Sequence, residues 1–101
     1  EAKMNKKEKL QKIKKVRSMI DHTDSKILPL IVKRSKLVNK ALELKSKKNE
    51  IVDRKRIKQI LKKIEINSRK MKANPKLIKS IWISMIQNFI EYERREFRKR
   101  K

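Results

Sequence analysis

One acidic residue of the segment F-I-E-Y-E-R-R-E-F, residues 89–97, lies on the apolar side of the helix that this segment predicts. The carboxyl group of Glu93 shares a face with Phe89 and Phe97, because residues three and four positions apart are neighbours on a helix surface. A carboxyl group in such a place can hold a proton beside a small molecule, so we expect Glu93 to line a pocket. The alternative is a partly buried Glu93 that pairs with a neighbouring arginine such as Arg94, or with a basic side chain of a partner chain.

Two basic residues also fall on an apolar face. Arg34 lies between Leu30 and Leu37. Lys45, eleven positions after Arg34, lies about 20° round the helix and about 16 Å along it. Two long cationic side chains on one face can hold an anion between them. Extension of both side chains along the edge of a helix interface is an equal alternative on geometry alone.

Arg17 lies on the same predicted helix as Arg34 but far from it. It lies about 25 Å from Arg34 along the same helix, so the two guanidinium groups of one chain cannot hold one small ligand. If the first helices of two subunits pack antiparallel, Arg17 of one subunit arrives beside Arg34 of the other, and the shared site occurs twice in the dimer. Asp53 and Arg56 stand at a predicted loop-to-helix boundary, where helix capping explains Asp53. Arg56 faces either solvent or the interior.

The segments that must position these residues are helical. The chain has 101 residues, no Gly and two Pro, which almost excludes the tight turns of a β-sheet protein, and its abundant Lys, Ile, Leu, Glu and Arg favour helices in most cases. We therefore expect an all-α fold with a loop over residues 46–52. The three expected helices are a long one over residues 9–46 that Pro29 kinks, a short one after Asp53, and a medium one after Asn74-Pro75.

The chain is expected to form one small helical domain over residues 1–101, with frayed basic tails over 1–8 and 98–101. Its long first helix carries one apolar stripe, and little chain is left to cover that stripe. A second copy of the chain is the simplest partner, so we expect a homodimer. The apolar residues of the third helix that we expect to be buried are Ile78, Ile81, Trp82, Met85, Ile86, Phe89, Ile90 and Phe97.

The charge balance of the chain is extreme, with 33 basic and 11 acidic residues and a net charge of +22. Such a surface attracts nucleic acid, anionic lipid and small polycarboxylates alike, so charge alone does not select a partner. A basic helical nucleic-acid-binding protein is the rival from a different class. Inward-facing basic residues are not needed for phosphate contacts, and the few aromatic residues sit mostly on the apolar stripe. We therefore expect no nucleic-acid partner.

Composition also limits the chemistry and the location. The chain has no Cys and a single His, His22, so we expect neither disulfides nor a metal ligand set. The longest apolar run, I-L-P-L-I-V at residues 27–32, is too short to span a bilayer, and no secretory leader is visible. We expect a cytoplasmic protein without a membrane partner.

These residues also share a family's pattern. The runs R-S-M-I-D-H-T-D-S-K-I-L-P-L-I-V-K-R-S-K-L-V, D-R-K-R-I-K-Q-I-L and I-W-I-S-M-I-Q-N-F-I-E-Y-E, together with Lys45, resemble the all-helical class of chorismate mutases. The likeness extends from Arg17 to about Phe97. Its most specific part is the I-D-x-x-D segment combined with an arginine seventeen positions after Arg17 and a lysine eleven positions further on.

The resemblance implies an intertwined dimer of three-helix chains with two active sites built partly across subunits. The implied reaction is the pericyclic rearrangement of chorismate to prephenate, an isomerase step of the shikimate pathway and aromatic amino-acid biosynthesis. It needs no metal or cofactor. The enzyme folds a flexible dianion into a chair and stabilises the charge that develops in the transition state.

The resemblance also implies roles for single residues. Arg17 and Arg34 occupy the positions that bind the two carboxylates of the substrate, with Arg34 also counted as catalytic, because planar guanidinium groups match carboxylates. Lys45 and Glu93 occupy the positions that contact the ether oxygen. An ionised Glu93 would repel that oxygen, whereas a protonated one donates to it; burial favours the neutral acid and nearby cations favour the charged form. The sequence leaves the two effects opposed.

Four further positions belong to the expected site. Asp53 and Arg56 match the loop aspartate and the second-helix arginine of the family. Ile57 stands where many members carry a glutamate that holds the ring hydroxyl, and Phe89 stands where some carry a serine. Apolar residues at both places also occur in the related isochorismate pyruvate lyases, which share the fold. We favour chorismate as the substrate because Glu93 is typical of the mutases, whereas the lyase resemblance predicts Gln there.

Overall fold

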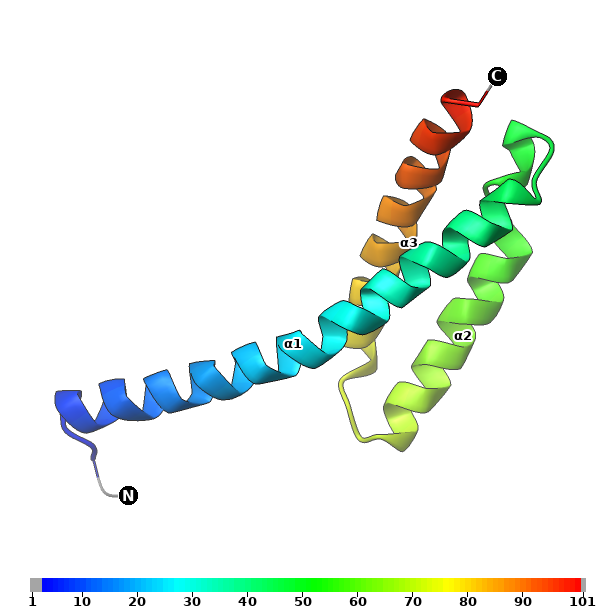
Figure 1. The fold of residues 1–101 in the computed structure, drawn as a ribbon. Helices are drawn as coiled ribbons and strands as arrows, with labels where there is room; N and C mark the ends of the chain where they lie inside the picture. Colours follow the sequence, from blue (N-terminus) through cyan, green and yellow to red (C-terminus); the bar gives the residue numbers. More distant parts are fainter. Residues whose placement is uncertain (1–2, 101) are drawn as a thin grey trace. The chain divides into compact units, whose positions relative to one another are not determined.

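The computed structural model describes residues 3–100. Within this range the chain forms three α-helices and one short 3-10 turn, and it has no strand (Figure 1). The predicted all-α class and the order of a long, a short and a medium helix are confirmed. The elements are α1 (Lys6–Glu43), the 3-10 turn η1 (Lys48–Glu50), α2 (Arg54–Lys70) and α3 (Pro75–Arg98).

Helix α1 begins and ends three residues earlier than the sequence pattern predicts. Its start is fixed by Asn5, whose Oδ1 accepts from the Glu8 backbone N–H at 2.8 Å and so satisfies one of the unpaired donors of the first turn. Residues 6–8 of the expected N-terminal tail are therefore helical, while residues 1 and 2 lie outside the described range. The helix continues through Pro29 without a break, as expected.

The chain divides into two compact units, and the boundary lies between Lys36 and Leu37. The first contains most of α1, and the described residues up to Val32 are all exposed. Its apolar stripe includes Val16, which is 54% exposed, and Leu30, which is 66% exposed. A single helix cannot bury its own apolar stripe.

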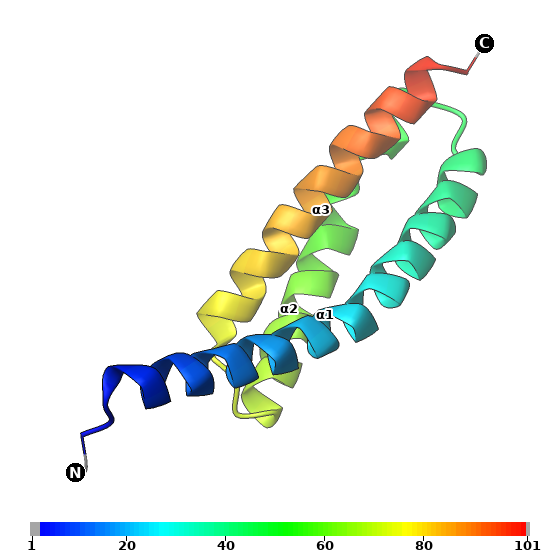
Figure 2. The same ribbon diagram turned by 60° about the vertical axis from the view of Figure 1, so that its left-hand side comes forward.

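The second unit begins at Leu37 and contains the end of α1, η1, α2 and α3. Helices α2 and α3 run side by side in opposite directions, as both views show (Figures 1 and 2). The buried apolar residues Leu42, Ile51 and Ile86 come from α1, the loop and α3 respectively. In the described part of the chain, no helix is long and apolar enough to cross a membrane.

Both predicted helix starts in the second unit are confirmed. The Asp53 carboxylate accepts from the backbone N–H of Arg56 at 3.0 Å. The Asn74 side chain accepts from the backbone N–H groups of Lys76 at 3.1 Å and Leu77 at 3.2 Å, and Pro75 follows in the first turn. Each side-chain oxygen satisfies donors that have no partner within the helix.

The end of α2 requires a backbone conformation that glycine usually supplies. Lys72 has a φ of 58°, in the left-handed region. The backbone N–H of Ala73 donates to the Ser68 carbonyl at 2.9 Å, and that of Lys72 donates to the Arg69 carbonyl at 3.0 Å. This pair of bonds is a Schellman motif, and a chain without Gly places a lysine at its left-handed position.

The burial predicted for α3 is only partly correct. Ile86 is buried, but Ile81 is 50% exposed, so the prediction that Ile81 belongs to the core is wrong. Leu77 and Ile83 are exposed beside it. A stripe at helical spacing is buried only where another element covers it, and the described residues of the second unit leave this part of α3 uncovered. The other six residues of the predicted set are half-buried: Ile78, Trp82, Met85, Phe89, Ile90 and Phe97.

Candidate active site

A lysine and a buried glutamate meet within the second unit. The Nζ atom of Lys45 lies 2.9 Å from Oε1 of Glu93, as both a hydrogen bond and an ion pair. The Glu93 side chain is 9% exposed and that of Lys45 is 22% exposed. The two residues are 48 positions apart in the sequence, and their contact joins the turn after α1 to the last third of α3.

Local backbone geometry brings Lys45 to this position. At the end of α1 the hydrogen bonds shorten to three-residue steps, with the Leu44 N–H on the Ala41 carbonyl at 3.2 Å and the Lys45 N–H on the Leu42 carbonyl at 3.0 Å. Such tightening is common in a last helical turn. It ends α1 at Glu43 and leaves Lys45 in the turn that follows the helix.

A second polar contact holds α1 to α3 next to this pair. The hydroxyl group of Tyr92 donates to Oδ1 of Asn39 at 2.8 Å. Because Tyr92 precedes Glu93 and Asn39 lies in the last two turns of α1, the two contacts together fix how these helix ends approach each other.

The alternative that Glu93 pairs with Arg94 is wrong. The Nη1 atom of Arg94 lies 2.7 Å from Oε1 of Glu91, on the surface of α3. The buried carboxylate therefore pairs with the lysine and not with the neighbouring arginine.

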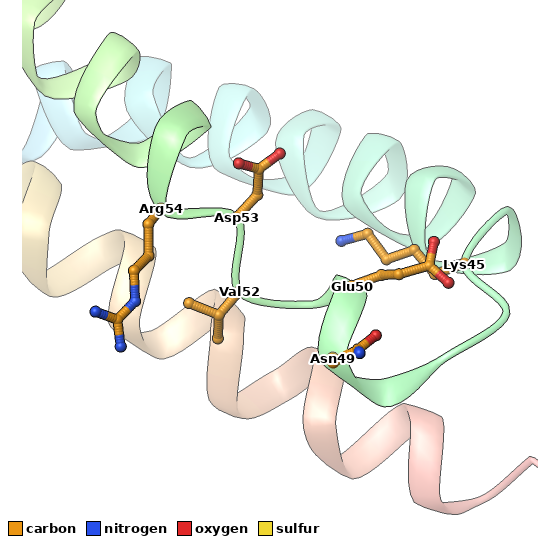
Figure 3. Close-up of a pocket in the computed structure, with 6 residues that line it drawn as sticks. All are labelled: Lys45, Asn49, Glu50, Val52, Asp53 and Arg54. Atoms are coloured by element: carbon orange, nitrogen blue, oxygen red, sulfur yellow. The ribbon is translucent and has the colours of Figure 1, made fainter.

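An open cavity lies beside the loop that connects α1 to α2. Its volume is ≈ 600 Å³, within the range of about 300–1,000 Å³ that small-molecule sites occupy. Lys45 and Asp53, both predicted site residues, line it together (Figure 3). Figure 3 also shows the carboxylate of Asp53 directed away from the side chains of Val52 and Arg54, which lie on the other side of the loop. The remaining lining residues, none of them predicted, are Asn49, Glu50, Val52 and Arg54.

The carboxylate of Glu50 stabilises the loop between Lys45 and Asp53 by accepting two backbone hydrogen bonds. Its Oε1 accepts from the backbone N–H groups of Ser46 at 3.0 Å and Lys47 at 2.8 Å. The loop between Lys45 and Asp53 is thereby fixed by a side chain that sequence reasoning missed. Glu50 stands three positions after the cap residue Lys47, which is the spacing of a capping box, but lysine replaces the usual Ser or Thr, so the sequence offered only this spacing as a signal.

The other predicted site residues are distributed between the two units. Arg56 is exposed, and its backbone N–H donates to the Asp53 carboxylate. Ile57 and Phe89 are half-buried in the second unit. Arg17 and Arg34 belong to the first unit, where Arg17 is exposed and Arg34 is half-buried. Among residues 3–100, no group of three or more His, Asp or Glu side chains is placed to hold a metal ion.

Fold and site together define a class, namely a small all-α protein in which a half-buried lysine pairs with a buried glutamate and also lines an open cavity of ligand size. The family model for chorismate mutase type II matches residues 16–94, well over half of the chain, and the chain therefore belongs to that family. No curated protein and no solved structure matches it.

The replacement Lys45→Met tests the pair as a structural contact. It leaves the buried Glu93 carboxylate without a cation, so we expect the free energy of unfolding to fall by about 1.5–3 kcal/mol, measured by urea denaturation at fixed protein concentration. The matched control is Lys99→Met, which breaks the surface pair with Glu96, where the Lys99 side chain is 72% exposed. We expect that control to lose less than about 0.5 kcal/mol. Equal losses in the two variants would contradict a stabilising role for the buried pair.

Proposed function

We propose that the protein is a chorismate mutase, which converts chorismate to prephenate in the aromatic branch of the shikimate pathway, in the cytoplasm. The single observation that carries the proposal is the contact of buried Glu93 with Lys45 at 2.9 Å, in a chain of the chorismate mutase type II family. These are the two groups that the family resemblance assigns to the ether oxygen.

The reaction suits this pair because it is pericyclic. A C–O bond breaks while a C–C bond forms, so no nucleophile is needed and negative charge grows on the ether oxygen. Lys45 donates a hydrogen bond to that oxygen and stabilises the charge as it develops. The contact with Glu93 and the low exposure of both side chains support a preorganised donor that needs little rearrangement when substrate binds.

Two arginines serve the carboxylates of the substrate in this proposal. Arg34 and the Arg17 of a second subunit each present a planar guanidinium group to one carboxylate. The exposed apolar stripe of the first unit supports the required dimer, because α1 has no other partner within its own unit. Asp53 and Arg56 complete the polar rim, and Ile57 and Phe89 form apolar walls.

Glu93 acts as the second donor to the ether oxygen. Only a proton-bearing carboxyl group can donate, and the ionised form would repel the oxygen. In the absence of ligand the carboxylate faces the Lys45 ammonium. In this proposal Glu93 therefore carries a proton when it contacts the substrate.

Incubation of the purified protein with chorismate, followed by product identification, tests the proposed function. We expect prephenate, and we expect Lys45→Ala to lower kcat by about 10²- to 10³-fold because it removes the main donor to the developing charge. Lys99→Ala is the control and should keep wild-type kcat. Salicylate and pyruvate from isochorismate, without prephenate from chorismate, would assign the lyase reaction instead, and no product from either substrate would overturn the enzyme proposal.

A pH profile of the Glu93→Gln variant tests the role of the proton. Wild-type kcat should rise as pH falls, because the fraction of Glu93 that bears a proton increases. The side-chain amide of the glutamine variant always has a hydrogen to donate, so the variant should remain active with a flat profile over the same range. An inactive glutamine variant, together with a flat wild-type profile across neutral pH, would contradict the assignment.

Mixing two inactive variants tests whether the site is shared between subunits. After subunit exchange between Arg17→Ala and Lys45→Ala chains, half of the dimers are mixed and each carries one intact site, so about a quarter of wild-type activity should return. The control mixes Lys45→Ala with Glu93→Ala. These two residues meet within one chain, so no intact site can form and no activity should return. Failure of the first mixture to recover would place Arg17 and Lys45 in the same subunit's site, or in none.

A further inference from the structure

The side chain of Arg100, the last described residue, contacts backbone carbonyl groups at the end of α1 and at Lys45. The guanidinium group of Arg100 donates through Nη1 to the carbonyl oxygens of Lys45 at 2.9 Å and Leu42 at 3.3 Å, and through Nη2 to that of Glu43 at 3.3 Å. The sequence pattern predicts this segment as a frayed, solvated tail. In the structure Arg100 is exposed, yet its side chain returns to the end of α1.

These carbonyl groups lie at the end of α1 and in the turn that follows it, and the Leu42 carbonyl also accepts the Lys45 N–H at 3.0 Å. The last four carbonyls of a helix have no partner within it, and many helices satisfy them with a glycine in the left-handed conformation. This chain has no glycine. The Arg100 guanidinium donates to the carbonyl groups of Glu43 and Lys45 and adds a second donor to that of Leu42. Its positive charge also interacts favourably with the negative end of the helix dipole.

The guanidinium group is oriented by α3 as well. Its central carbon lies 4.9 Å from the centre of the Phe97 ring, a cation–π contact. The Arg100 backbone N–H donates to the Phe97 carbonyl at 3.0 Å, so the turn that ends α3 continues as far as Arg100. The Phe97 ring and the turn at the end of α3 together orient the planar guanidinium group of Arg100 toward the three carbonyl groups.

We propose that Arg100 is a positioning residue for Lys45, an inference that rests on the proposed function. Lys45 stands outside α1, in a turn that one three-residue-step hydrogen bond, from its N–H to the Leu42 carbonyl, joins to the helix. Arg100 holds the Lys45 carbonyl from one side, while Glu93 holds the Lys45 ammonium from the other. The donor to the ether oxygen is thereby fixed at both its backbone and its tip. Arg100 itself does not contact the substrate.

A lysine at position 100 cannot replace this arrangement. Guanidinium presents several N–H groups in a rigid plane, whereas an ammonium group is a single compact donor on a flexible stem. The positive charge at the helix end would remain in Arg100→Lys, but the fork across three carbonyl groups would be lost. This difference separates positioning from a general effect of charge.

Steady-state kinetics of Arg100→Ala, Arg100→Lys and Lys99→Ala test the proposal. We expect Arg100→Ala to lower kcat about 10-fold with KM changed less than about 2-fold, because a displaced Lys45 weakens contacts made in the transition state more than those made to bound substrate. Arg100→Lys should recover only part of this loss, and added methylguanidinium should raise kcat of Arg100→Ala while equal NaCl does not. Lys99→Ala, which removes one adjacent positive charge, should behave as wild type.

A second readout keeps the test independent of activity. In NMR spectra, the carboxyl carbon of Glu93 should shift in Arg100→Ala, since the Lys45 ammonium is less firmly held, and should stay in place in Lys99→Ala. Far-UV circular dichroism at the assay temperature establishes that each variant is folded. Should Arg100→Ala fail to fold, Arg100→Gln, which retains two N–H donors, takes its place.

Each outcome separates this proposal from the proposed function. An unmoved Glu93 signal together with a wild-type kcat in Arg100→Ala would overturn the positioning role, as would full recovery by lysine. A wild-type protein without activity, but with a Glu93 signal that depends on Arg100, would overturn the chorismate mutase proposal and retain the structural coupling.

Discussion

The contact between the Lys45 ammonium and the buried Glu93 carboxylate is the constraint on which the second unit depends. A carboxylate with so little exposure is stable only if its charge has a partner. The partner has to come from outside α3, and it comes from the turn after α1. That turn is itself fixed by the Arg100 fork, by the Glu50 carboxylate in the loop, and by the buried side chains of Leu42 and Ile51. The Lys45–Glu93 pair is therefore a structural contact of the second unit and, under the proposed function, also a part of the catalytic site.

The first unit obeys a different rule. Its helix carries apolar side chains at helical spacing, and all of those up to Val32 are exposed. Exposed stripes of this length are costly for an isolated chain, and a partner helix is the physical remedy. The apolar surface at the start of α3, around Ile81, presents the same need on a smaller scale. Under the proposed function, assembly of two chains would cover these apolar surfaces and complete the site.

Sequence reasoning succeeded where the determining interaction is local. Asp53 and Asn74 were predicted as helix caps because a capping side chain reaches only two or three residues along the chain. The inward position of Glu93 was predicted from helical periodicity, and it is buried. The resemblance brought Lys45 to the same site, because no spacing rule relates two residues so far apart in the sequence. Arg17 and Arg34 stay predictions.

The missed features depend on contacts that no periodic pattern contains. Arg100 and Glu50 act on backbone groups of a loop, and their roles emerge only once the end of α1 is placed. Ile81 was assigned to the core because its spacing is correct, but burial depends on what covers a face. The left-handed residue after α2 was also unforeseen.

That residue, Lys72, illustrates the consequence of building a protein without glycine. The left-handed backbone costs a lysine about 1–2 kcal/mol relative to the right-handed form. In return, every residue of the unfolded chain carries a β-carbon, which narrows its conformational freedom and reduces the entropy lost on folding. The strain at one corner is local, whereas the gain is spread along the entire polypeptide. The reduced conformational freedom of the unfolded chain thus favours the native state. This contribution opposes the repulsion among the many like charges of the chain.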